Sequence, residues 1–162
     1  MRTLRFSLLL LCAGSLALGQ ETAVTVSMSN TPALVLTVPK GTKVTPKENK
    51  TVIQTPDMFL HVWPVPGMKT PAEVVPRLAD LIKGDVLKFN ATMTNTITVA
   101  GAPALHLIGN AVEADDGDAA TADLVIFAVG PRVFVACVHG EANDASKERE
   151  PMLRVLKTAQ KP

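Results

Sequence analysis

Cysteine is scarce in this chain of 162 residues, which contains only Cys12 and Cys137. Cys12 lies in a leader-like amino-terminal segment, so a processed chain would keep one thiol and no internal disulfide. We therefore expect packing, not cross-links, to hold the fold. Apolar neighbours surround Cys137 in RVFVACVHG, which predicts a buried and unreactive thiol on a strand.

The chain also lacks a strong charge of one sign, since 16 Lys and Arg residues face 15 Asp and Glu residues. Nucleic-acid binding needs a clear basic excess, so the composition argues against it. No segment after the leader is apolar for long enough to cross a bilayer. A G-x-S-x-G elbow, a glycine-rich phosphate loop and an H-E-x-x-H motif are all missing. We therefore expect neither enzyme activity nor a cofactor.

The first residues, MRTLRFSLLLLCAGSLALGQ, have the pattern of a secretory signal. Arg2 and Arg5 precede an apolar run, and the small residues of ALG at 17–19 suit a signal peptidase. The pattern predicts cleavage after Gly19 and a single domain over residues 20–162, exported to the periplasm or the cell exterior. Two alternatives are a buried amino-terminal helix and lipid attachment at Cys12, although the preceding Leu11 is unusual for the latter.

Alternating β-branched residues predict strands at 22–29 and 33–38, and residues 39–50, PKGTKVTPKENK, read as a solvated loop. A short strand is expected at 51–55. The segment 57–65, DMFLHVWPV, predicts a longer strand with His61 and Trp63 on one face.

Two segments have helical spacing of apolar residues. In TPAEVVPRLADLIKGD, Thr70 and Glu73 have the spacing of a capping box, and Pro76 should kink the helix or delay its start. The second helix is expected over 143–160. Asn143 or Asp144 would cap it, and Pro151 should kink it or delay its start.

Four strands are expected at 86–99, 102–114, 120–130 and 132–140, and the last two are apolar on both faces. A strand that is apolar on both faces must be covered on both faces. The two helices are available to do this. The sequence therefore predicts an α+β fold with a central twisted antiparallel sheet and helices on both faces, an α/β/α sandwich.

The segment VEADDGDAATAD at 112–123 places several acids between two of these strands. Asp116 followed by Gly117 is typical of a hairpin turn. The acids do not have the spacing of a calcium loop, so we favour a turn and keep weak calcium binding as the alternative. Asp115, Asp116 and Asp118 are also candidates for contacting a partner.

The remaining candidate residues are basic, aromatic or metal-binding. His61, His106, Cys137 and His139 fall on predicted strands and would suit zinc or copper if they converged. The simpler interpretation is that each histidine has its own hydrogen bond in or near the core. Trp63 is expected in the core, with partner anchoring as the alternative. The basic residues Lys40, Lys43, Lys47 and Lys50 form either a solubilising loop or a site for an acidic partner.

The element order and several short segments resemble the PsbP-like superfamily, which includes the extrinsic subunit of photosystem II and DcrB-type periplasmic proteins. The segments are TVPKGTKV, TVAGAPALHLIG, LVIFAVGPRVFVACVHG and MLRVLKT, within residues 33–158. The chain departs from the usual pattern at Thr158, where serine is common. The resemblance implies an α/β/α sandwich with a binding or accessory role, and no shared catalytic residues.

These observations favour an exported, non-catalytic domain that binds a protein or an envelope component as a monomer or weak dimer. One alternative is an extracytoplasmic metal-binding protein that uses the histidines and Cys137. The other is an enzyme whose site is assembled from scattered residues.

Overall fold

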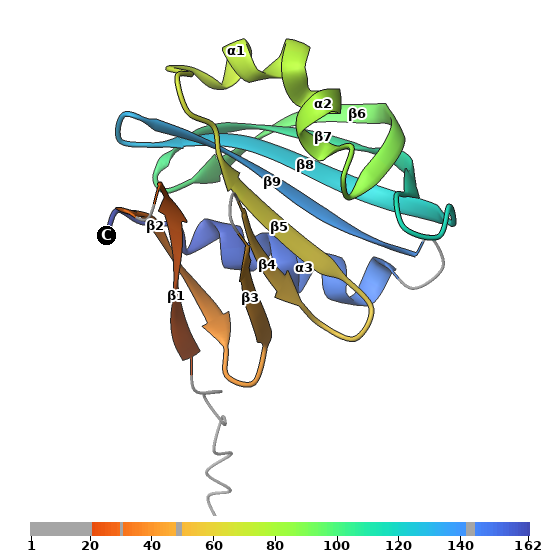
Figure 1. Cartoon of the computed structure of the whole chain (residues 1–162), viewed down its shortest axis with the longest axis horizontal. Coiled ribbons are helices and arrows are strands. Elements are labelled where there is room, and N and C mark those ends of the chain that lie inside the picture. Colours follow the sequence, from red (N-terminus) through yellow and green to blue (C-terminus); the bar gives the residue numbers. More distant parts are fainter. Residues whose placement is uncertain (1–20, 30, 48–49, 142–144) are drawn as a thin grey trace, which may run out of the picture.

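The computed structural model describes residues 21–29, 31–47, 50–141 and 145–162. The expected signal segment and the candidate caps Asn143 and Asp144 lie outside these residues. Figure 1 shows the arrangement of the elements. In chain order they are β1 (Glu21–Met28), β2 (Thr31–Pro39), β3 (Lys43–Lys47), β4 (Lys50–Gln54), β5 (Phe59–Pro64), α1 (Pro71–Val74), a 3₁₀ turn (Val75–Arg77), α2 (Leu78–Ile82), β6 (Val86–Val99), β7 (Ala102–Glu113), β8 (Ala119–Val129), β9 (Arg132–Glu141) and α3 (Ala145–Lys157).

The expected α+β class and antiparallel sheet are confirmed. Seven strands pair in the order β3-β4-β5-β9-β8-β7-β6, and β1 and β2 form a separate two-stranded sheet. The last four strands are the predicted meander. In contrast, β5 pairs with β9, far away in the sequence, so that Phe59 lies opposite His139 and His61 opposite Cys137. This long-range pairing brings two of the three histidines onto neighbouring strands.

The prediction that residues 39–50 form a loop is wrong, because strand β3 lies within this segment. β3 pairs with β4, and Val44 lies opposite Ile53. Pro46 misled the prediction, but a proline is tolerated at the edge of a sheet, where its missing N–H breaks no ladder. β3 is such an edge strand. Its lysines therefore project from a hairpin that borders the sheet.

The first helical segment is interrupted where Pro76 predicted it. A 3₁₀ turn at Val75–Arg77 separates α1 from α2, as expected where a proline removes a backbone donor. The capping box is wrong in its details: the Thr70 hydroxyl donates to the Glu73 carboxylate at 3.1 Å instead of capping a backbone N–H. At Pro151 the sequence predicted a kink or a late start, and the late start is excluded because α3 begins at Ala145 and contains Pro151.

Two buried apolar clusters lie against the strands, and they separate the alternating residues of β8 as predicted. Val125 and Phe127 belong to the cluster that includes β1, β2 and α3. Leu124 and Ile126 belong to the cluster that includes Val74 and other residues of α1 and α2. The closing hairpin is thus buried on both sides. Within the described residues, no helix has the length and apolar character that would let it traverse a lipid bilayer.

Candidate functional site

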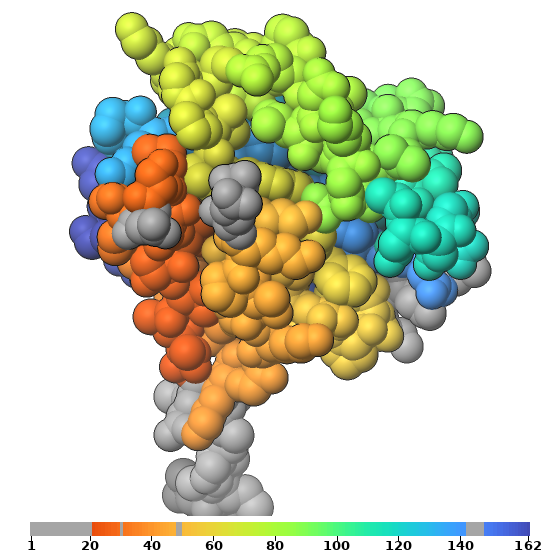
Figure 2. Space-filling model, in the orientation of Figure 1, coloured from red at the N-terminus to blue at the C-terminus, as the bar shows by residue number. Residues whose placement is uncertain are grey.

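A cavity of about 410 Å³ lies at one end of the seven-stranded sheet. Its exposed lining includes Lys43 and Lys47 from β3 and Asp115 from the β7–β8 turn, while His61 and His139 in its lining are buried. Figure 2 shows the hollow between the orange β3–β4 hairpin and the green-to-teal segments, with blue atoms of β9 inside it. The cavity therefore has charges of both signs at its mouth and buried imidazoles below.

His61, on β5, forms a hydrogen bond with the Asp85 carboxylate, with 2.5 Å between Nδ1 and Oδ1. Asp85 lies in the turn after α2. Its N–H donates to the Ile82 carbonyl, and its own carbonyl accepts from Ala114 N–H at 3.0 Å. Lys50, at the start of β4, forms an ion pair with the same Asp85 oxygen, and its Nζ lies 3.3 Å from His61 Nδ1. Two backbone hydrogen bonds and two basic groups thus fix this carboxylate.

Burial and pairing set the charges of this group. Burial lowers the pKa of His61, and the hydrogen bond that the ring donates to Asp85 offsets the effect only in part. For Asp85, burial by itself raises the pKa, but hydrogen bonds from His61 and Lys50 outweigh it, so the pKa is lower than usual. At neutral pH the structure therefore holds an uncharged His61 imidazole beside an ionised Asp85.

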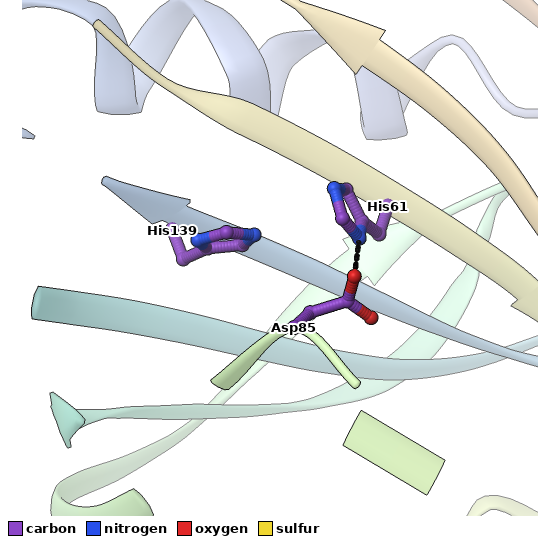
Figure 3. A group of neighbouring side chains, drawn as sticks. All are labelled: His61, Asp85 and His139. Atoms are coloured by element: carbon purple, nitrogen blue, oxygen red, sulfur yellow. Dashed lines mark ion pairs between the residues drawn. The ribbon is translucent and has the colours of Figure 1, made fainter. Parts of the chain in front are cut away.

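His139, on β9, has a carboxylate partner of its own, since its Nδ1 lies 3.2 Å from Oε1 of the buried Glu113. Its ring stacks on Phe59 and meets the His61 ring edge-on, with ring centroids 4.9 Å apart. Nε2 of His61 and Nε2 of His139 are buried, and neither has a hydrogen-bond partner within the part of the chain that the structure describes. Figure 3 shows His61, Asp85 and His139 turned toward one another.

The structure does not bring the four candidate metal ligands together. His106 faces the opposite side of the sheet, where it contacts Asp123 at 2.5 Å, and Asp123 also accepts two hydrogen bonds from Arg149 of α3. Cys137 shares the face of His61 and His139 but is fully buried in the apolar cluster. Burial raises the pKa of the Cys137 thiol well above its usual value, as expected for an unreactive cysteine.

The candidate residues for partner contact also lie in different environments. Trp63 is buried in the core, and the Lys50 ammonium lies 5.5 Å from its ring centroid. Lys50 is directed to the buried carboxylate, whereas Lys43 and Lys47 line the cavity mouth. Lys40 lies in the turn between β2 and β3. The four lysines are therefore not one uniform basic surface.

The acidic segment forms the turn between β7 and β8. Asp116 Oδ1 accepts a hydrogen bond from Asp118 N–H at 2.9 Å, and Gly117 N–H donates to the Glu113 carbonyl. Gly117 has a φ of 83°, which glycine adopts without strain. Glu113, Asp115 and Asp116 each place an oxygen within 4.8 Å of the others. The turn's own hydrogen bonds account for this geometry.

Sequence reasoning did not identify the two carboxylates that hold the buried histidines. Asp85 appeared only as the last residue of the segment TPAEVVPRLADLIKGD, and Glu113 only as one acid of the segment VEADDGDAATAD. The available signal for Glu113 was its place within a strand, where alternation directs it to the side of Ala111. Asp85 carried no comparable signal, because a turn residue has no fixed periodicity.

No family model matches the chain, and no curated protein matches it in sequence. Among solved structures, cyanobacterial PsbP (CyanoP) from Synechocystis sp. PCC 6803 is similar, with a TM-score of 0.61 and 11% identity over 92% of this chain and 96% of that chain. LpqN, described as involved in cell envelope biogenesis of Mycobacterium tuberculosis, has a TM-score of 0.53 and 19% identity over 88% of this chain and 91% of that chain. The resemblance to PsbP-like proteins is thus confirmed at the level of the fold.

Proposed function

We propose that this protein is an exported, non-catalytic domain that binds a protein or a component of the cell envelope. The observation that carries the proposal is the likeness in fold to CyanoP and LpqN over nearly their whole lengths. The LpqN structure is described in terms of cell envelope biogenesis. The signal pattern of residues 1–19, with its two arginines and apolar run, supports a periplasmic or extracellular location.

The proposal includes the α/β/α sandwich expected from the sequence, with α1 and α2 on one sheet face and α3 on the other. The two separate buried clusters support it, because one contains residues of α1 and α2 and the other residues of α3. A packed sandwich of this kind leaves its loops and edge strands for recognition. We accordingly place the binding surface at the cavity mouth beside β3.

A binding role fits the partners of the three histidines. Each lies against a carboxylate: His61 against Asp85, His106 against Asp123, and His139 against Glu113. A general base for nucleophilic catalysis would also face a hydroxyl or thiol with its other ring nitrogen, whereas Nε2 of His61 and Nε2 of His139 have no hydrogen-bond partner among the described residues. The buried Cys137 thiol, with its raised pKa, is a poor nucleophile.

The cavity mouth has basic side chains on one side and an acidic side chain on the other, which suits a polar or charged partner. Lys43 and Lys47 project from the edge strand, and the exposed Asp115 lies on the acidic turn. Exposed charges act mainly through the rate of association and through specificity, and at physiological ionic strength salt largely screens exposed charges that are more than about 8 Å apart. We expect the protein to bind as a monomer or weak dimer.

Reversing both lysines tests this placement. In the double variant Lys43→Glu, Lys47→Glu we expect at least a tenfold loss of the partner that co-purifies from native envelopes with the untagged full chain, because two attractive charges become repulsive. Quantitative mass spectrometry of the captured proteins and lipids measures the loss. The matched control is Lys69→Glu, an exposed lysine outside the cavity. Equal capture by all three proteins, or capture insensitive to salt, would place the partner elsewhere.

A further inference from the structure

We propose that His61, Asp85 and His139 bind one divalent transition-metal ion of the zinc class, with Glu113 orienting His139. The inference is independent of the partner proposed above, because it uses the buried base of the cavity and not its charged mouth. It also differs from the four-residue site that the sequence suggested, since His106 and Cys137 take no part.

The three side chains come from separate elements, β5, the turn after α2, and β9, and converge on one point. One ligand atom of each lies within 4.8 Å of the others. Ligand atoms around a single tetrahedral zinc ion lie about 3.4 Å apart, given Zn–N and Zn–O distances near 2.1 Å. Closing the set requires the Lys50 ammonium to leave Asp85 and the hydrogen bond between His61 and Asp85 to give way. Figure 3 shows one nitrogen of the His139 ring directed toward the His61–Asp85 pair.

Both imidazoles are buried and each has a ring nitrogen without a hydrogen-bond partner among the described residues. His61 is 6% exposed and His139 4%, and the nitrogen in question is Nε2 in both rings. A buried polar atom without a partner is unfavourable, and a metal ion would satisfy it. Metal-binding histidines commonly have a carboxylate on the other ring nitrogen, which fixes the tautomer and the orientation of the ring. Glu113 occupies this position on Nδ1 of His139.

The donor set indicates which ion fits. Two imidazole nitrogens and one carboxylate oxygen suit zinc, whereas calcium and magnesium prefer oxygen ligands alone. Three protein ligands leave a fourth position, which faces a cavity of about 410 Å³ that is open to solvent. Such an open position is typical of zinc sites that exchange a water or a small ligand, whereas structural sites are closed by four protein ligands.

Lys50 is the group that competes with the metal ion. Its ammonium pairs with Asp85, lies 3.3 Å from His61 Nδ1, and is only partly buried, with 16% of its side chain exposed. An arriving cation must take its place beside the carboxylate, and Lys50 can turn toward the cavity. Replacing Lys50 with methionine removes the competing charge, together with its contact with the Trp63 ring, and keeps an unbranched apolar side chain at this position.

Zinc titration of the untagged full chain, after treatment with a chelator, tests the site by isothermal calorimetry and by metal analysis of the dialysed protein. We expect one zinc per chain, and at least tenfold weaker binding in His139→Ala and Asp85→Asn. In Glu113→Gln, which acts through His139, we expect binding to weaken about tenfold. In Lys50→Met we expect at least tenfold tighter binding, a gain that an unfolded protein cannot produce.

Matched controls separate this site from the other candidates. Cys137→Ser and the acidic-turn pair Asp115→Asn, Asp116→Asn should bind zinc as the wild type does, and cobalt bound in place of zinc should give visible d–d bands without a thiolate charge-transfer band. The proposal is overturned if zinc does not bind at one equivalent, if binding survives in His139→Ala, or if only the acidic-turn variant loses it. Unchanged affinity in Lys50→Met would also overturn it.

Discussion

The Asp123→Asn variant is expected to lose about 3 kcal/mol in its free energy of unfolding, because removing one member of a buried charge group leaves the others without a partner. Asp123 is 1% exposed and accepts hydrogen bonds from Arg149, and it contacts His106 at 2.5 Å. The Arg149 side chain is 33% exposed, so its guanidinium can regain some hydration in the variant. The expected loss in free energy of unfolding is therefore near the lower end of the range for broken buried ion pairs. Urea unfolding followed by circular dichroism measures it.

The same carboxylate makes the stability of the protein depend on pH in acid. Burial by itself raises the pKa of Asp123, but hydrogen bonds from His106 and Arg149 outweigh it and lower the pKa below its ordinary value. A lowered pKa in the folded state stabilises the protein above the ordinary value near 4, and this contribution is lost as the pH falls through the folded pKa. The variant should therefore show a shallower loss of stability below about pH 4.

The control for this pair of measurements is Asp80→Asn, whose carboxylate is 83% exposed beside Lys83. An exposed ion pair contributes about 0–1 kcal/mol, so this variant should unfold almost as the wild type does. If Asp123→Asn and Asp80→Asn had equal stabilities at neutral pH, the buried charge group on the α3 side of the sheet would contribute nothing to the fold.

Phe127→Ala is expected to lower the free energy of unfolding by about 4 kcal/mol, through lost apolar burial and the cavity that remains. The Phe127 ring is fully buried and stacks on Phe134 of the neighbouring strand, with centroids 5.5 Å apart. Phe127→Leu keeps most of the volume and should cost about 1 kcal/mol. Urea midpoints at a constant m-value give both numbers.

An exposed apolar residue provides the comparison for Phe127. Met93 on β6 is 54% exposed, and Met93→Ala should change stability by less than about 0.5 kcal/mol. A loss under about 1 kcal/mol in Phe127→Ala would mean that this face of the closing hairpin does not form a close-packed core. That result would remove the physical basis on which the sequence predicted a covered sheet.

The alternation of apolar residues along the chain predicted much of this fold, because it determines which face of a strand is buried. The sequence predicted two apolar faces for this strand, and Leu124 and Ile126 do lie in one apolar cluster while Val125 and Phe127 lie in the other. Prediction failed for β3, where the prolines and lysines of residues 39–50 indicated a loop. An edge strand tolerates both residue types, because one of its sides makes no ladder hydrogen bonds.

The candidate site was predictable only in part, because its geometry depends on pairing between distant strands. Alternation placed His61 and Trp63 on one face of β5, but it could not show that β5 lies beside β9 and brings His61 near His139. The same limit hid the separation of His106, whose position opposite Val125 directs it to the α3 side. Asp85 enters from a turn, and no spacing rule connects it to either histidine.

The backbone hydrogen bond from Ala114 to Asp85 has a consequence for how signals could pass through this molecule. Ala114 directly follows Glu113, so the two acids that steady the imidazole rings are connected through one peptide bond and this backbone hydrogen bond. A ligand that moved the main chain of the acidic turn would therefore act on both acids. Binding at the acidic turn and binding at the two buried imidazoles would then be thermodynamically linked. A ligand at either place would change the affinity of the other place for its own ligand by the same factor.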